Sequence, residues 1–277
     1  MLQNPYKTKD AVVQWVRAFF SRSAPGASAV IGISGGKDSS VAAALCAEAL
    51  GKERVVGVTM PDGQQPDIED SYALIKHLGI RSMEINIHNI ISAVKWEFSH
   101  SIEVCELCGQ TKLSKQARVN LPPRIRMAVL YASAQMLPHG GLVVNTCNRS
   151  EDYVGYSTKF GDAAGDFSPL ADFTMHEVLQ LGKALKLPET LIYKVPSDGL
   201  SGLTDEDNLG FTYDVLDSYI ENGICPDADI KAKIDALHQR NLHKLQPIPF
   251  FQKDSKCRTN VVEGGLDYNG EKEADYH

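Results

Sequence analysis

One stretch constrains the fold more than any other, residues 29–40 (AVIGISGGKDSS). It begins with apolar, largely β-branched residues, which are typical of a buried parallel strand. A Ser-Gly-Gly turn follows, and then an alanine-rich segment that predicts a helix ending at Gly51. Free backbone N–H groups and the positive helix end converge at such a turn, and glycine lets an anion come close. The stretch therefore predicts a phosphate site, with Lys37 as an added cation and serine hydroxyls as donors.

This loop differs from other phosphate-binding patterns. It is neither Gly-x-x-x-x-Gly-Lys-Ser/Thr nor Gly-x-Gly-x-x-Gly. Asp38 would repel a phosphate unless a divalent cation lay between them. The alternative is a plain tight turn with an acid at the helix start, where an acid is ordinarily stabilising. We favour the phosphate site because strand, turn and helix signals agree. The pattern Ser-Gly-Gly-x-Asp-Ser also resembles the loop of ATP pyrophosphatases, which split ATP between its α and β phosphates.

Composition narrows the class of protein. The 277 residues carry a net charge of −7, which argues against a general nucleic-acid or membrane-surface binder. No apolar run approaches the roughly 20 residues that cross a bilayer, and residues 1–6 have no signal-peptide pattern. Six scattered cysteines favour reduced thiols in a cytoplasm. We expect one domain over 1–260 and a polar, loose tail over 261–277.

Strand and helix patterns alternate along the chain, which predicts an α/β fold with a doubly wound parallel sheet, Rossmann-like, with helices on both faces and a helical C-terminal part. Further strands are expected over 54–60, 81–87 and 141–146. Helices are expected over 7–23, 67–78, 89–98, 118–137, 174–187, 211–219 and 228–240, with a short one from Thr204. Ligands of such sheets bind beyond the carboxyl ends of the strands, where Ser34 lies.

Three loops follow strands and so reach that same edge. Residues 60–67 are either a base-contacting loop or a plain connection. Residues 148–151 place polar groups after the last strand, and Glu151 could complete a metal site with Asp38. The loop 152–172 lacks periodicity and is long for a plain connection, which favours a functional role.

Residues 99–126 leave two questions open. Cys105 and Cys108 form a lone C-x-x-C, which supplies two of the four ligands that zinc prefers; loop packing is the favoured reading. The next helix is expected over 118–137, with Pro122 and Pro123 in its first turn or just before it. Arg124 and Arg126 lie two positions apart and cannot share a helix face, so one of them should point inward or to an interface.

Taken together, six segments in order resemble the ammonia-dependent NAD synthetases over about 4–249. These segments are residues 32–39, 61–67, 120–127, 145–166, 204–210 and 243–244. The first segment alone is shared with other ATP pyrophosphatases, whereas the whole series is much more specific. The resemblance implies amidation of nicotinate adenine dinucleotide (deamido-NAD) by ammonia, with ATP as co-substrate and Mg²⁺ as cofactor. Adenylation of the carboxylate would supply AMP as the leaving group, and pyrophosphate would be released.

The resemblance also implies residue roles. Lys37, Asp38 and Glu151 would be catalytic, and Asp38 and Glu151 would hold Mg²⁺, with Asp162 as a possible ligand of a second metal ion. The residues implied for ATP are Gly32, Ile33, Ser34, Gly35, Gly36, Lys37, Asp38, Ser39, Thr146 and Ser197. The residues implied for the dinucleotide are Asn120, Arg124, Lys159, Asp166, His243 and Lys244, the last two on a mobile segment. A homodimer through the 118–137 helix is implied as well, without nucleic-acid or membrane partners.

The chain departs from the family pattern at three places. Met175 stands where the family usually has a lysine on an ATP phosphate, so that His176, Lys183 or Lys37 would have to compensate. Ser197 replaces the usual threonine, and the segment after it is short. No glutaminase domain is visible, which implies free ammonia or a separate ammonia source.

Alternative functions remain open. A tRNA-thiolating ATP pyrophosphatase shares the loop and often carries a C-x-x-C, but the negative charge and the absence of a basic patch count against it. A non-catalytic nucleotide-binding protein would bind ATP without releasing pyrophosphate. A third possibility is an ammonia ligase that acts on a different carboxylate.

Overall fold

The computed structural model describes residues 1–65, 67–193 and 204–251. A compact unit spans Met1–Leu245, and Gln246–His277 form a second unit. Of the second unit, residues 246–251 are described, and they are exposed and outside helices and strands. The expected boundary near residue 260 and the expected tail lie beyond the described residues and stay predictions.

The first unit is built on a parallel sheet with the strand order β3-β2-β1-β4. These strands are β1 (Ser28–Gly32), β2 (Val55–Thr59), β3 (Arg81–Glu84) and β4 (Gly141–Val143). Central strand β1 pairs in parallel with β2 and with β4. Four parallel strands in this order, joined through helices, confirm the predicted α/β class.

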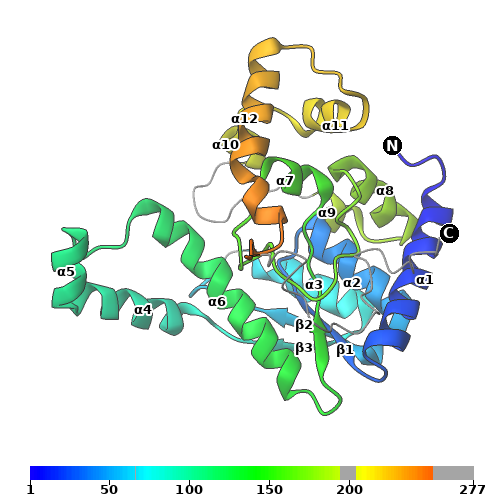
Figure 1. Ribbon diagram of the computed structural model, residues 1–277. Helices are drawn as coiled ribbons and strands as arrows, with labels where there is room; N and C mark the ends of the chain where they lie inside the picture. Colours follow the sequence, from blue (N-terminus) through cyan, green and yellow to red (C-terminus); the bar gives the residue numbers. More distant parts are fainter. Residues whose placement is uncertain (66, 194–203, 252–277) are drawn as a thin grey trace, which may run out of the picture. The chain divides into compact units, whose positions relative to one another are not determined.

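Helices cover both faces of the sheet (Figure 1). One face packs against α1 (Pro5–Ser23), α2 (Lys37–Leu50) and α8 (Met175–Ala184), and the other against α4 (His88–His100) and α6 (Lys115–Met136). The short helix α5 (Ile102–Cys108) links α4 to α6, and Figure 1 shows these three helices as an arm that extends from the sheet. The 3₁₀ turn η1 (Lys52–Arg54) lies just before β2, and α3 (Ile68–Leu78) connects β2 to β3.

Besides the apolar cores on the two faces of the sheet, a separate apolar cluster holds the C-terminal helices together. It joins α7 (Arg149–Val154), α10 (Asp205–Leu209), α11 (Tyr213–Asn222) and α12 (Ala228–Leu245). The short helix α9 (Glu189–Ile192) packs instead against α2 and α8. This cluster confirms the predicted helical C-terminal part. In the described part of the chain, no helix is long and apolar enough to cross a membrane.

Two predicted helix boundaries are wrong. Helix α6 begins at Lys115 and contains Pro122 and Pro123 in its interior, because Ser114 caps an earlier start by accepting a hydrogen bond from the Ala117 N–H. Helix α12 does not end at Arg240 but continues to Leu245. There Asn241 is buried, and its Nδ2 donates to the carbonyls of Val154 and Leu237, at 2.9 Å each. This anchor keeps the following turn helical, so that His243 and Lys244 lie on the helix rather than on the mobile segment expected.

Candidate active site

The loop between β1 and α2 has the geometry of an anion cradle. Gly35 has φ +74°, and a Cβ there would lie 2.7 Å from the Asp70 Cβ, so that only glycine fits. The Ser34 and Ser39 hydroxyls lie 3.1 Å apart, and the Gly36 N–H donates to Ser34 Oγ. No side chain caps the N-terminus of α2 in the described part of the chain. The first N–H groups of α2 are therefore available to an anion.

Lys37 is buried directly beside this cradle. It is 4% exposed, and its Nζ lies 3.0 Å from Asp38 Oδ2. Burial lowers the pKa of Lys37, but the carboxylates of Asp38, Glu151 and Asp205 outweigh it, so that the pKa is raised above its ordinary value. The ammonium group therefore stays charged and is held by carboxylates rather than by solvent.

Asn148 brings the two predicted metal-binding acids together. Its Nδ2 donates to Asp38 Oδ1 at 2.9 Å. Its Oδ1 accepts from the Glu151 N–H at 3.0 Å, and its own N–H donates to Glu151 Oε2 at 3.3 Å, which is the capping box of α7. The sequence reasoning missed Asn148 as a site residue, although Asn-x-x-Glu after a strand is the signal of such a box.

The electrostatics of this pair suit a divalent cation. Burial raises the pKa of Glu151 well above its ordinary value, and the neighbouring Asp38 carboxylate raises it further. A cation would relieve this unfavourable proximity, and Mg²⁺ typically uses one or two carboxylates together with substrate phosphates. The described residues contain no group of three or more His, Cys, Asp or Glu side chains that could hold a metal. Asp162 is not grouped with this pair: its Oδ1 accepts from the Thr158 N–H at 2.9 Å, and its role at a second metal ion stays a prediction.

Most residues predicted for the carboxylate substrate lie around the loop that follows α7, between α6 and α12. Asn120 accepts from the Thr158 hydroxyl at 2.8 Å, and the Arg124 Nε donates to the Lys159 carbonyl at 3.3 Å. On the other side, Lys159 Nζ donates to the His243 carbonyl at 2.5 Å. Lys244 Nζ donates to the carbonyls of Gly155 and Ser157, at 2.6 and 2.8 Å.

The remaining predicted residues have separate positions. Asp166 holds the end of the sheet, because its carboxylate accepts from the Val143 N–H at 2.7 Å and from the Tyr131 hydroxyl at 3.3 Å. Thr146 follows β4 and lies near the carboxyl edge of the sheet. Ser197 lies outside the described residues. Arg126 is the inward arginine of its pair: its Nε donates to the Met60 carbonyl at 3.2 Å, and burial lowers its pKa.

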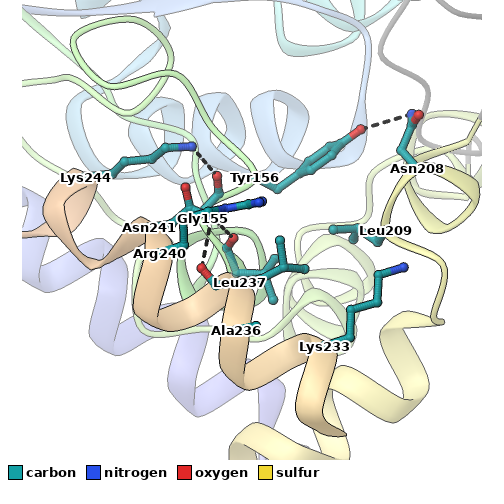
Figure 2. A pocket seen from close by; sticks show the side chains of 11 residues that line it. Gly155, Tyr156, Asn208, Leu209, Lys233, Ala236, Leu237, Arg240, Asn241 and Lys244 are labelled. Atoms are coloured by element: carbon teal, nitrogen blue, oxygen red, sulfur yellow. Dashed lines mark hydrogen bonds between the residues drawn. The ribbon is translucent and has the colours of Figure 1, made fainter. Parts of the chain in front are cut away.

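A cavity of about 540 Å³ lies between the end of α7, α10 and α12 (Figure 2). Its polar lining includes Lys233, Arg240 and Lys244 from α12, and a hydrogen bond of 3.3 Å joins Asn208 Nδ2 to the Tyr156 hydroxyl. Among the described residues, no carboxylate lines it. Burial lowers the pKa of Lys244; the Asp162 carboxylate opposes this shift, and repulsion from Arg240 adds to it. The cavity therefore borders the predicted substrate residues on the side of α12.

Two of the three cationic side chains expected to compensate for Met175 are engaged elsewhere. His176 Nδ1 lies 2.7 Å from Asp217 Oδ2, and its Nε2 lies 2.8 Å from Asp214 Oδ1. Lys183 Nζ lies 5.2 Å from the centroid of the Tyr193 ring. Met175 itself packs against the C-terminal apolar cluster. Of the three, Lys37 lies at the cradle.

Cys105 and Cys108 are both exposed on α5, in the arm formed with α4 and α6. They are not part of a group of metal ligands among the described residues. The pair thus lies on an exposed helix rather than in the packed loop that the sequence favoured.

The fold and the cradle define an α/β protein of the pyrophosphate-loop fold, and comparisons with known proteins specify it further. A family model described as NAD synthase matches residues 9–248. The NH(3)-dependent NAD(+) synthetase of Thermococcus sibiricus is 40% identical over 239 residues, which cover 85% of this chain and 87% of the relative. That of Alkaliphilus oremlandii is 35% identical over 253 residues, which cover 90% and 99%.

Solved structures of NAD and NMN synthetases have the same fold as this chain. An NMN synthetase from Francisella tularensis superposes with a TM-score of 0.78 at 32% identity, covering 90% of this chain and 99% of that one. An NH3-dependent NAD synthetase from Campylobacter jejuni superposes with a TM-score of 0.71 at 25% identity, covering 91% and 100%. The chain belongs to the NAD synthase family, as the resemblance predicted.

Proposed function

We propose that this protein is an ammonia-dependent NAD synthetase, a ligase that amidates deamido-NAD to NAD and converts ATP to AMP and pyrophosphate. The observation that carries the proposal is the family match over 9–248 together with the cradle, in which Lys37, Asp38 and Glu151 gather at the N-terminus of α2. A reaction that adenylates a carboxylate needs such a concentration of positive charge and cation ligands.

The chemistry assigns a task to each part of the cradle. A carboxylate does not react with ammonia, because oxide is a poor leaving group, whereas an acyl adenylate releases AMP. Attack of the carboxylate on the α phosphate breaks the bond to the β phosphate, and negative charge accumulates on the departing pyrophosphate. The N–H groups of α2 and the Lys37 ammonium would stabilise that charge. Mg²⁺, held by Asp38 and Glu151, would supply further charge neutralisation.

The other predicted residues would bind and orient substrates. Thr146, Ser197 and the loop residues 32–39 would bind ATP. Asn120, Arg124, Lys159, Asp166, His243 and Lys244 would contact the dinucleotide. The hydrogen bonds that join the loop after α7 to both α6 and α12 support this, because they keep most of these side chains together. The protein thus mainly positions and neutralises, and no side chain acts as a nucleophile.

A second candidate substrate is nicotinate mononucleotide, the smaller acid that amidation would convert to NMN. The similarity to the Francisella NMN synthetase supports it, because its TM-score exceeds that of the Campylobacter NAD synthetase. Both acids share the nicotinate carboxylate and one phosphate-bearing ribose, so the cradle chemistry is the same for both. The named relatives above are NAD and NMN synthetases, which disfavours the tRNA-thiolating and non-catalytic alternatives.

We also propose a homodimer, formed through α6 and its neighbours in the cytoplasm. The arm of α4, α5 and α6 exposes large apolar side chains, as an interface would. They include Trp96, Phe98, Ile102, Leu107 and Val119, which are 44% to 87% exposed. A mass equal to one chain in light scattering under assay conditions would contradict the dimer.

A single assay tests the activity. The protein is incubated with ATP, Mg²⁺ and ammonium, and with either deamido-NAD or nicotinate mononucleotide, and the amide, AMP and pyrophosphate are quantified. We expect one equivalent each of AMP and pyrophosphate per amide formed. Comparison of kcat/KM for the two acids decides between the two substrates, and replacing ammonium by glutamine tests the ammonia source. Absence of an amide product with both acids would refute the proposal.

A further inference from the structure

Tyr213, the first residue of α11, has a buried hydroxyl without a hydrogen-bond partner among the described residues. The side chain is 2% exposed. A buried hydroxyl left unpaired destabilises the folded protein, and buried tyrosines usually find a partner. The hydroxyl therefore adds a cost to the free protein that phenylalanine would avoid.

The position of Tyr213 relates this hydroxyl to the cradle. Its ring lies against Lys37, whose Nζ is 5.7 Å from the ring centroid. The phenol lies within electrostatic range of Glu151, Asp205 and Asp38, in decreasing order of effect. These are the same acids whose charges act on the Lys37 ammonium.

The backbone fixes Tyr213 in this position. The Tyr213 N–H donates to Glu206 Oε1 of α10 at 2.8 Å, and the residue belongs to the apolar cluster of the C-terminal helices. Helix α11 therefore carries a polar group from the far end of the chain to the β1–α2 loop. The sequence reasoning gave Tyr213 no role, because the residue lies within an amphipathic helix.

We propose that Tyr213 is a positioning residue for the divalent cation at Asp38 and Glu151, and that its hydroxyl hydrogen-bonds to a water ligand of that cation. Mg²⁺ keeps several of its waters when it binds through one or two carboxylates. Hydrogen bonds to groups in a metal's first shell orient them and tune affinity. A phenol can both donate and accept, so it suits a water held between acids. The inference rests on the proposed function, because it takes the cradle as the ATP·Mg²⁺ site.

The test compares Tyr213→Phe with a matched control on the same helix, Tyr219→Phe. The Tyr219 hydroxyl has a partner in the free protein, since it donates to Asp235 Oδ1 at 2.6 Å. Thermal unfolding of the full chain is measured in EDTA. Mn²⁺ binding is then followed by electron paramagnetic resonance, with saturating ATP and no carboxylate substrate, so that no turnover occurs.

We expect opposite results for the two variants. Tyr213→Phe should unfold in EDTA at the same temperature as the wild type or higher, because it loses an unpaired hydroxyl, and its Kd for Mn²⁺ should rise about tenfold. Tyr219→Phe should unfold at a lower temperature, because it loses a made hydrogen bond, and its Kd for Mn²⁺ should not change. If Tyr213 had a purely structural role, the substitution would change the unfolding temperature in EDTA and leave the Kd for Mn²⁺ unchanged.

Two outcomes would overturn the inference alone. These are a Tyr213→Phe protein that binds Mn²⁺ as tightly as the wild type, and one that unfolds in EDTA at a clearly lower temperature. Either would leave the proposed function standing. A wild-type protein that takes up no Mn²⁺ in the presence of ATP would overturn both the inference and the metal role proposed for Asp38 and Glu151.

Discussion

Positive charge reaches the proposed site from two regions that differ in kind: Lys37 in the cradle, and Lys233, Arg240 and Lys244 on α12. In the cradle, Lys37 is 4% exposed and bound to its sequence neighbour Asp38 at 3.0 Å. On α12, Lys233 and Arg240 are exposed, and Lys244 is half-buried and donates to loop carbonyls. The cradle cation is thus fixed locally and desolvated, whereas none of the three α12 cations is paired with a carboxylate among the described residues. The difference implies that changes in the cradle affect the chemical step, and changes on α12 affect substrate affinity.

The largest expected effect comes from Asp38→Asn, which keeps the shape of the side chain and removes its charge. Asn148 can still hydrogen-bond to the new amide, so the fold should persist. Pyrophosphate release should fall at least about a hundredfold, because charge neutralisation by a bound metal is worth several kcal/mol. Release is measured with a coupled pyrophosphate assay. Asp172→Asn, at a side chain that is 98% exposed, is the matched control and should retain full activity.

If Asp38→Asn released pyrophosphate at the wild-type rate, Asp38 would have no role in metal binding. The cradle would then no longer differ from α12 in its effect on the chemical step. A variant with normal chemistry but a raised requirement for ATP would place Asp38 in ATP binding alone. The ATP dependence of the residual rate separates these cases.

A moderate effect is expected from Lys244→Met, which keeps the length of the side chain and removes its charge. We expect KM for the carboxylate substrate to rise about tenfold, the effect of losing one hydrogen bond to a charged group. The kcat should change little, because Lys244 lies apart from the cradle. Steady-state kinetics at saturating ATP measure both values. Lys231→Met on the same helix is the control, since Lys231 is paired with Asp235 at 2.7 Å and does not line the cavity.

If Lys244→Met lowered kcat and left KM unchanged, α12 would contribute to the chemical step, as the cradle does. The proposed division between a catalytic cradle and a substrate-binding α12 would then be wrong. The same comparison can be repeated with the mononucleotide acid. A smaller rise in KM for that substrate would indicate that Lys244 serves the part of the dinucleotide that the mononucleotide lacks.

The two regions also differ in how far the sequence predicts them. The β1–α2 loop could be placed from residues 29–40 alone, because its strand, turn and helix signals are local and agree. The end of α12 could not, because the Asn241 anchor to the Val154 carbonyl joins segments far apart in the chain. Helix α6 shows the same limit: a local rule places Pro122 at a helix start, and Ser114 overrides it. Asn148 shows it too: its position after the last strand is visible in the sequence, but its hydrogen bond to Asp38 joins residues 110 positions apart.

The smallest expected effect concerns the stability of the free protein and follows from Glu151. Because its pKa is raised by burial and by Asp38, the folded protein binds a proton more tightly there than the unfolded chain does. This contribution to stability is complete below the unfolded pKa of Glu, about 4.5, and is lost as pH rises through the folded pKa. The acid is therefore a cost to the free cradle at neutral pH, and a cation would offset it.

Glu151→Gln should remove that cost. In EDTA at neutral pH, the variant should unfold at a slightly higher temperature than the wild type, and the difference should shrink as pH is lowered. With ATP and Mg²⁺ the order should reverse, because only the wild type gains from the cation. Differential scanning calorimetry across pH, with and without the ligands, measures both differences. A variant that is less stable than the wild type in EDTA at neutral pH would show that Glu151 supports the fold through its capping bond to Asn148, and not the cation.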